Sequence, residues 1–404
     1  MSVIGYLVSQ YPAVSHTFIR REIEAVRGNG VAIRTYSIRP GHSSAACQPA
    51  TTHAPATFTV LRQPAIAFAA AHLGALAKNP IRYFSTLHLA LRHRVPGLRA
   101  FLWSIFHFAE AIVLARQLRR DGVTRLHNHF ANPAATVGLL ATRYLGLPWS
   151  LTLHGISEFD YPAGLLLPAK LERAEFAACV SYFGMAQAMR LTRPDLWPRL
   201  TLVRCGIDPA DLPAAPASAR TSDRIELICV GRLSPEKGHA GLLVAVAALV
   251  GKGIPVRLTL VGHGPEEAAL KARVHALEID AHVDFAGVCD EAATLQAIAG
   301  SDILVLASFM EGLPIVLIEA MGLGVPVIAS RVAGIPELVS DGETGLLFDP
   351  ANWAQLAHVL ERLCKDDSLR RELAVSAKLR VREEFCYPDA AKPLIERFRE
   401  APLA

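Results

Sequence analysis

The feature that most constrains the fold is a regular alternation of short apolar strands with helical stretches, which runs through both halves of the chain. In the first half, the pattern predicts strands at 3–8, 31–37, 125–127, 149–153 and 176–181. In the second half, it predicts strands at 225–230, 256–261, 282–285, 303–306, 326–329 and 345–348. Such alternation is typical of parallel sheets with helices on both faces. The chain is therefore predicted to be an α/β protein, and its 404 residues are enough for two domains.

A segment rich in Pro, Ala and Ser at 203–223 marks the predicted domain boundary. It separates a Rossmann-like N-terminal domain at 1–205 from a Rossmann-like C-terminal domain at 206–385. The last residues, 386–404, are expected to form a helix that packs back on the first domain. The two parallel sheets are expected to face each other across a cleft. Open parallel sheets bind ligands beyond the carboxyl ends of their strands, so we expect a site in the loops at those ends.

Charge is distributed unevenly between the two predicted domains. Residues 1–205 contain 22 Lys and Arg against 9 Asp and Glu, and no acidic residue lies between Glu24 and Glu110. This imbalance indicates an anionic surface or ligand, such as phospholipid headgroups or nucleic acid. No aromatic side chains alternate with the arginines as single-strand binding requires, so nucleic acid is not expected as a partner.

The region 57–120 combines this positive charge with a predominantly helical pattern. Two apolar runs, Pro64–Ala77 and Ala100–Ala115, are shorter than the roughly 18 to 20 residues that a membrane-spanning helix needs. Two interpretations remain open for them. They are helices that cover a sheet, or helices that lie at a membrane interface.

The cysteines and histidines give no sign of a metal site or of a disulfide framework. The seven cysteines are scattered, odd in number and never in C-x-x-C spacing, which favours a reducing, cytoplasmic location. The N-terminus reads as a first strand rather than a signal peptide. His127 and His129 form an H-x-H pair with no carboxylate nearby in the sequence, so we expect acceptor-side or structural roles and no metal.

Two loops at predicted strand ends are candidates for phosphate binding. In "CVGRLSPEKGHAGLL", Arg232 and Lys237 lie between a strand and a helix, where two cations and a helix N-terminus suit a diphosphate. The alternative is a solvated turn. In "TLVGHGPEEAAL", Gly262 and Gly264 allow either close approach to a ligand or a plain tight turn, and the dinucleotide fingerprint fails because no third glycine follows.

Two carboxylates stand in an otherwise apolar run, "SFMEGLPIVLIEAMGLG". Glu311 is placed in the loop after a strand, and Glu319 on a helix that begins near Pro314. The free backbone N–H groups near Leu313–Val316 are suited to an anion, and the carboxylates are suited to sugar and ribose hydroxyls. Without a bound sugar nucleotide, Glu311 and Glu319 are expected to be hydrated.

These motifs together resemble the retaining glycosyltransferases of family four, which have the GT-B fold. The resemblance rests on E-G-L-P-x-x-x-x-E-A-M, preceded by V-G-R-L-x-x-x-K-G and V-G-x-G-P, in matching order and spacing over most of residues 200–385. Ala333, where Gly is common, and Gly322, where Ala is common, depart from the family pattern. In the first half, "YLVSQYPAVSHTFIRREIEAV", "HNHFANPAATVG" and "LTLHGISEFD" resemble the branch that builds exopolysaccharides such as colanic acid.

The resemblance implies transfer of a sugar, with retention and without a metal or other cofactor, from a UDP- or GDP-sugar to a hydroxyl of a glycan or a polyprenyl-diphosphate-linked oligosaccharide. By the same resemblance His154 matches the family's cleft histidine. The implied catalytic residues are His154, Glu311, Arg232 and Lys237. The implied donor-binding residues are Arg232, Lys237, Gly262, Gly264, Gly312, Leu313, Pro314, Ile315 and Glu319. The competing classes are a nucleotide-sugar epimerase or hydrolase of the same fold and a non-catalytic scaffold. The basic first half is expected to contact an anionic membrane surface. The protein is therefore expected to bind peripherally at the inner face of the plasma membrane.

Overall fold

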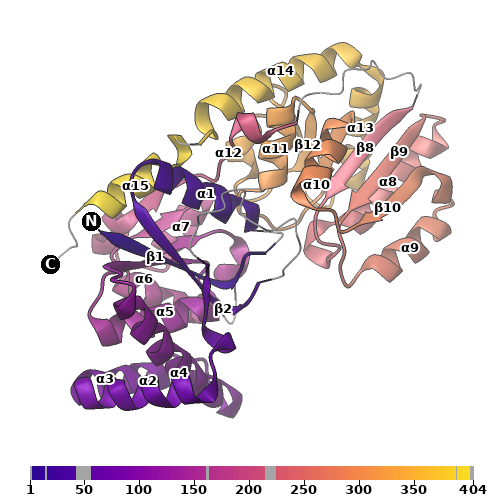
Figure 1. Ribbon diagram of the computed structural model, residues 1–404. Helices are drawn as coiled ribbons and strands as arrows, with labels where there is room; N and C mark the ends of the chain where they lie inside the picture. The colour runs from indigo at the N-terminus through magenta and orange to yellow at the C-terminus, as the bar shows by residue number, and fades with distance from the viewer. Residues whose placement is uncertain are drawn as a thin grey trace. The chain divides into compact units, whose positions relative to one another are not determined.

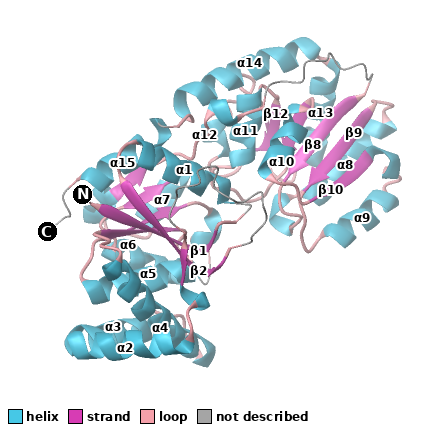
Figure 2. Ribbon diagram, viewed as in Figure 1, coloured by secondary structure: helices cyan, strands magenta, loops and turns pink. Residues whose placement is uncertain are grey.

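The computed structural model describes residues 2–13, 16–41, 56–160, 163–213, 224–387 and 389–400. The chain divides into two compact units (Figure 1). Unit 1 comprises Met1–Arg204 together with Ala391–Ala404, and unit 2 comprises Cys205–Ala390. In each unit, helices cover a parallel sheet (Figure 2).

The described part of unit 1 contains a seven-stranded sheet in the order β3-β2-β1-β4-β5-β6-β7, and every strand pair is parallel. Its strands are β1 (Val3–Tyr11), β2 (Ala32–Pro40), β3 (Phe58–Thr59), β4 (Arg125–His129), β5 (Trp149–Leu153), β6 (Ala177–Cys179) and β7 (Leu200–Leu202). The chain runs outward from β1 to β3 and then returns to place β4 on the other side of β1. The carboxyl ends of β1 and β4 therefore form a topological switch point, where parallel sheets bind ligands.

Helices flank this sheet, and the last helix of the chain also belongs to unit 1. The helices are α1 (Thr17–Gly28), α2 (Ala65–Lys78), α3 (Pro80–Arg92), α4 (Leu98–Arg120), α5 (Pro133–Leu145), α6 (Ala163–Arg173), α7 (Tyr182–Arg190) and α15 (Lys392–Arg399). Arg397 Nε of α15 donates to Thr201 Oγ1 at 2.9 Å, and Arg125 Nη1 donates to the Arg397 carbonyl at 2.7 Å. These bonds attach the C-terminal helix to the β4 and β7 side of the sheet.

Unit 2 has its own described sheet of six strands, in the order β10-β9-β8-β11-β12-β13, again wholly parallel. Its strands are β8 (Ile225–Val230), β9 (Val256–Val261), β10 (Val283–Gly287), β11 (Ile303–Leu306), β12 (Val327–Ser330) and β13 (Leu346–Phe348). Its helices are α8 (His239–Gly251), α9 (Glu267–Ala276), α10 (Glu291–Ala299), α11 (Ile315–Leu323), α12 (Ile335–Leu338), α13 (Trp353–Lys365) and α14 (Asp367–Glu384). The switch point of this sheet lies between β8 and β11.

Two strands of unit 1 are longer than predicted, because strand pairing continues beyond their apolar residues. Strands β1 and β2 continue to Tyr11 and Pro40 because parallel pairing joins Gln10 to Arg39 and Tyr11 to Pro40. Helix α6 begins at Ala163 and holds Pro168 inside. Residues 214–223 of the predicted linker lie outside the described residues.

The second apolar run, Ala100–Ala115, lies in helix α4, which is longer than the run itself. It is 23 residues long because polar and charged residues extend it past Ala115 to Arg120. By length and composition alone it is the helix, among those described, that is long and apolar enough to cross a membrane. However, 44% of its apolar window is buried inside the protein, where residues 111–115 and Leu118 belong to the core of unit 1.

Candidate active site

The switch point of unit 2 brings together two of the expected site residues. Lys237 ends a short 3₁₀ turn, Pro235–Lys237, after β8, and Glu311 lies in the loop after β11. The Lys237 Nζ atom donates to Glu311 Oε1 at 2.6 Å. The Phe309 N–H also donates to the Glu236 carbonyl at 2.8 Å, which ties the two loops together. Neighbouring parallel strands thus place a cation and a carboxylate, 74 positions apart in the sequence, in one ion pair.

Glu311 has protein partners, so the expectation that it is hydrated without a donor is wrong. Ser308 Oγ donates to the same Oε1 atom at 2.6 Å, and the Glu311 side chain is 9% exposed. A buried carboxylate needs such partners because desolvation is costly. Ser308 was not predicted as a site residue, although its position three residues before Glu311 in a strand-end loop was a usable signal.

Arg232 lies on the same loop as Lys237 and is exposed. No ion pair to its guanidinium occurs within the described ranges, so its donors face solvent. A lysine carries three donors and an arginine five. Lys237 can therefore hold Glu311 and still donate to an anion, with Arg232 beside it on the loop.

Gly262 and Gly264 have a packing role in the β9 loop. A Cβ atom on Gly262, whose φ is +140°, would clash with the Gly231 carbonyl oxygen. A Cβ atom on Gly264 would clash with the Leu233 carbonyl oxygen. The Leu233 N–H donates to the His263 carbonyl at 3.2 Å, and the Glu266 N–H donates to the Leu233 carbonyl at 3.0 Å. The two glycines thus let the β9 loop support the backbone that carries Arg232.

Helix α11 carries the second carboxylate of the motif. Pro314 is its N-cap residue, with φ of −73°, and the helix starts at Ile315. The Leu317 N–H donates to the Pro314 carbonyl at 3.1 Å, so the N–H groups of Ile315 and Val316 are the ones without an intrahelical partner. Gly312 precedes this N-terminus, and Leu313 is buried. Glu319 lies on the second turn and is buried. The expected anion site at this N-terminus and the ion pair of Glu311 therefore belong to one continuous loop and helix.

His154 follows β5 in unit 1 and belongs to a chain of buried polar groups. His154 Nε2 lies 2.9 Å from His129 Nδ1, and His129 Nε2 lies 3.3 Å from Glu22 Oε1. Tyr6 Oη donates to the same Glu22 oxygen at 2.9 Å. A carboxylate accepts only, so Glu22 favours the tautomer with the proton on His129 Nε2, and in that tautomer Nδ1 accepts from His154 Nε2–H. This order leaves the Nδ1 lone pair of His154 for a substrate hydroxyl.

Burial and aromatic rings keep His154 neutral. The Phe130 and Phe18 rings lie with centroids 4.6 and 4.8 Å from the His154 ring. Burial lowers the pKa of His154 well below its usual value, and the neighbouring His129 lowers it further. Phe130 has φ of +67°, an unusual conformation for a bulky residue, and its N–H donates to the Thr152 carbonyl at 3.0 Å. The backbone is thus held in a strained conformation that places the Phe130 ring against His154.

Glu158 and Lys170 fix the loops around His154, and neither was predicted as a site residue. The N–H groups of His154 and Gly155 donate to Glu158 Oε2 at 2.5 and 2.9 Å, and the Ala131 N–H donates to Oε1. Lys170 Nζ donates to the Ala131 carbonyl at 2.5 Å. Burial lowers the pKa of Lys170 to about 7, which the nearby Glu158 partly offsets, and burial raises the pKa of Glu158 against its backbone hydrogen bonds. The acid in "HGISE" was the available sequence signal for Glu158.

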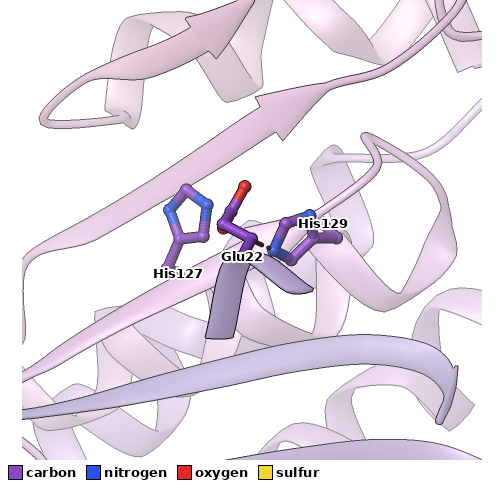
Figure 3. A group of neighbouring side chains, drawn as sticks. All are labelled: Glu22, His127 and His129. Atoms are coloured by element: carbon purple, nitrogen blue, oxygen red, sulfur yellow. Dashed lines mark ion pairs between the residues drawn. The ribbon is translucent and has the colours of Figure 1, made fainter. Parts of the chain in front are cut away.

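The carboxylate that the nearby sequence lacks is supplied in space by Glu22. Figure 3 shows Glu22 from α1 beside both rings, and their ligand atoms lie within 4.8 Å of one another. Glu22 was missed because it is more than 100 residues away in the sequence. However, both ring nitrogens of His127 already bond hydroxyls, Nδ1 to Ser150 Oγ and Nε2 to Thr152 Oγ1, each at 2.8 Å. The donor set therefore fits a hydrogen-bonded buried network better than a metal site.

Two Rossmann-like units with parallel sheets are the architecture of the GT-B fold. A solved structure of Anabaena Alr3699/HepE in complex with UDP and glucose aligns with a TM-score of 0.76, covering 98% of this chain and 99% of that one at 19% identity. That likeness shows the fold.

The family is visible in the sequence of unit 2. Residues 214–380 match the family described as glycosyl transferases group 1, and the chain carries a domain of this group. N-acetyl-alpha-D-glucosaminyl L-malate synthase of Bacillus anthracis is 29% identical over 297 residues, covering 70% of this chain and 77% of the relative. The putative colanic acid biosynthesis glycosyltransferase WcaL of Escherichia coli (strain K12) is 28% identical over 291 residues, covering 69% of this chain and 65% of the relative.

Proposed function

We propose that this protein transfers a sugar from a nucleotide diphosphate sugar to an acceptor hydroxyl, with retention at the anomeric carbon, in polysaccharide synthesis. The observation that carries the proposal is the Lys237–Glu311 ion pair at the switch point of unit 2, with the exposed Arg232 on the same loop. The colanic acid relative supports polysaccharide synthesis as the setting.

The groups of unit 2, and separately His154 of unit 1, have different proposed tasks in this reaction. Lys237 and Arg232 stabilise the negative charge that develops on the departing diphosphate, assisted by the N-terminus of α11. Glu311, held by Ser308, accepts hydrogen bonds from hydroxyls of the transferred sugar. Glu319 serves the ribose. In unit 1, His154 offers Nδ1 to a substrate hydroxyl and orients it.

The donor is proposed to be a UDP- or GDP-sugar, and thermal unfolding tests this choice. The HepE structures hold UDP and UDP-glucose, which favours uridine. A ligand that binds only the folded protein at 100 times its Kd should raise the Tm by about 5–10 °C. UMP and GMP are matched controls, because without the second phosphate they should give a smaller shift. If none of the UDP- or GDP-sugars raises the Tm, the proposed donor class is wrong.

The reaction is proposed to need no metal ion, since Lys237 and Arg232 supply the charge that a cation supplies elsewhere. Turnover after EDTA treatment and gel filtration should stay within about twofold of the untreated enzyme, because the charge comes from side chains. Metal analysis of the same sample checks for an ion held by Glu22, His127 and His129. Loss of turnover that Mg²⁺, Mn²⁺ or Zn²⁺ restores would contradict charge neutralisation by the two side chains.

The acceptor is proposed to be a glycan or a lipid-linked oligosaccharide at the cytoplasmic face of the plasma membrane. The support is chemical: unit 1 carries the excess of basic residues, and a polyprenyl diphosphate is an anionic group held at a membrane surface.

A further inference from the structure

Large apolar side chains are exposed together on the three helices that follow β3. On α4 they are Leu98, Leu102, Trp103, Ile105 and Phe106. On α2 and α3 they are Ile66, Leu73, Ile81 and Phe84. The three helices pack on one another and lie side by side at one end of unit 1 (Figure 1). We call this set of side chains the outer helical surface. Large apolar side chains exposed on neighbouring helices are typical of an interaction site in soluble proteins.

Helix α4 changes character along its length. Its second half is core, with Ala111, Leu114 and Leu118 fully buried. Its first half exposes Leu98, Leu102 and Ile105, which the spacing i, i+4, i+7 places on one face. The buried half anchors the helix in the protein fold. Only the exposed half is therefore free to contact something outside.

A shallow, open depression lies on the surface of this half of α4. It is lined by Arg99, Leu102, Trp103 and Phe106, and the Trp103 and Phe106 rings meet edge to face with centroids 5.6 Å apart. Trp103 is 42% exposed and Phe106 40% exposed. Trp and Arg side chains with an apolar body and a polar or charged tip are typical of the boundary between hydrocarbon and water.

The exposed charged side chains around the outer helical surface are basic. Arg62, Lys78, Arg82, Arg92 and Arg99 are exposed on or beside α2–α4, and no acidic residue occurs between Glu24 and Glu110. Glu110 itself is buried, and burial raises its pKa to about 7. The outer helical surface therefore presents apolar side chains among cations, which complements an anionic lipid headgroup layer.

We propose that the outer helical surface docks unit 1 on a bilayer containing anionic phospholipid, with Trp103 and Phe106 inserted at the headgroup level. Helix α4 lies in the interface rather than spanning it, because its second half is fixed in the core. A surface for a second copy of this chain would bring like charges together, whereas anionic lipid neutralises them. The inference deepens the proposed function, since it names the surface that would bring the enzyme to a lipid-linked acceptor.

Vesicle flotation without donor or acceptor tests the docking separately from catalysis. The full chain should float with vesicles of phosphatidylcholine and phosphatidylglycerol at low salt, and much less with phosphatidylcholine alone. The double variant W103S/F106S should lower the partition coefficient of the protein onto the vesicles by at least about tenfold. R99E should weaken binding about tenfold to the anionic vesicles only. V375S/L379S is the matched control, since Val375 and Leu379 are exposed apolar residues on α14 in unit 2, and it should bind as the wild type does.

Three further measurements decide the outcome. Bromolipid quenching of Trp103 fluorescence, in a W197F background that removes the other exposed tryptophan described, should be strong in anionic vesicles. Failure of the wild-type chain to float, or equal flotation of W103S/F106S, would overturn the docking. A concentration-dependent dimer in gel filtration that W103S/F106S abolishes would assign the surface to a second copy instead. Nucleotide-sugar binding, measured by thermal shift, reports on the proposed function independently, so its failure leaves the flotation result standing.

Discussion

Replacing Lys237 with alanine is expected to lower kcat/KM by at least about 10²-fold while the protein stays folded. Lys237 is the cation that reaches the β8–β11 switch point from one loop and pairs there with Glu311 from the other. Removal of a single well-placed donor to developing negative charge costs about 10²- to 10³-fold in kcat. Steady-state kinetics with the donor identified by thermal shift measure the effect.

A comparison with E311Q separates the two partners of the ion pair. If Lys237 holds the diphosphate, K237A should weaken binding of the nucleoside diphosphate product. E311Q keeps Lys237 and should leave that affinity within about threefold, while it lowers turnover because Glu311 holds the transferred sugar. The ion pair also stabilises the fold: K237A leaves Glu311 with Ser308 alone, which should cost about 1–3 kcal/mol.

The matched control for K237A is K252A. Lys252 forms an exposed ion pair with Glu361 at 2.5 Å in the same unit, far from the switch-point loops in sequence. Because exposed pairs contribute little, K252A should keep wild-type activity and nearly wild-type stability. Activity of K237A within a few-fold of wild type would exclude Lys237 as the neutralising group.

Much of unit 2 could be predicted from the sequence because its site is built from loops at strand ends. Strands β8, β9 and β11 lie at the predicted residues, so Arg232, Lys237 and Glu311 were correctly placed in strand-end loops. One of the two family departures has a physical cause: a Cβ on Gly322 would lie 2.6 Å from Ile207 Cδ1. Ala333 adopts φ of +48°, a conformation that favours glycine, and nothing in the structure explains the alanine.

The sequence could not predict which side chains meet inside unit 1. Glu22, His129 and His154 lie on α1, β4 and the loop after β5, and only the strand order β1-β4-β5 brings them together. Spacing along the chain carries no information on such a contact. The same limit hid Glu158, whose carboxylate binds backbone N–H groups from two loops. The roles of the predicted site residues stay predictions until the variants are measured.

The variant E22Q is expected to lower kcat/KM by about 10- to 100-fold, because it would change which ring nitrogen carries the proton in His129 and in His154. His129 Nε2 faces the Glu22 carboxylate at 3.3 Å, which favours a proton on that nitrogen, and with this tautomer Nδ1 of His154 is left unprotonated. A glutamine can instead donate its amide to His129 Nε2. His129 would then donate from Nδ1 to His154 Nε2, and His154 would carry its proton on Nδ1, facing the substrate. Glu22 acts through His129, so it is a positioning residue, and misplacing a substrate hydroxyl costs up to about 10²-fold.

Nitrogen-15 NMR of protein labelled in its histidines distinguishes this proton order from a loss of packing. In the wild type, His154 should show an unprotonated Nδ1 at neutral pH, and because its pKa lies well below the ordinary value of about 6.5, it should stay neutral as the pH falls through that value. The part of the folding free energy that depends on neutral His154 should therefore decline only as the pH falls below the pKa that His154 has in the unfolded chain.

In E22Q the protonated nitrogen of His154 should change from Nε2 to Nδ1, with kcat lowered more than KM is raised. The control E24Q removes a carboxylate of the same helix that pairs with Arg20 at the surface, and it should change neither spectrum nor rate. Wild-type turnover in E22Q, or an unchanged nitrogen-15 spectrum with reduced turnover, would show that Glu22 does not set the state of His154.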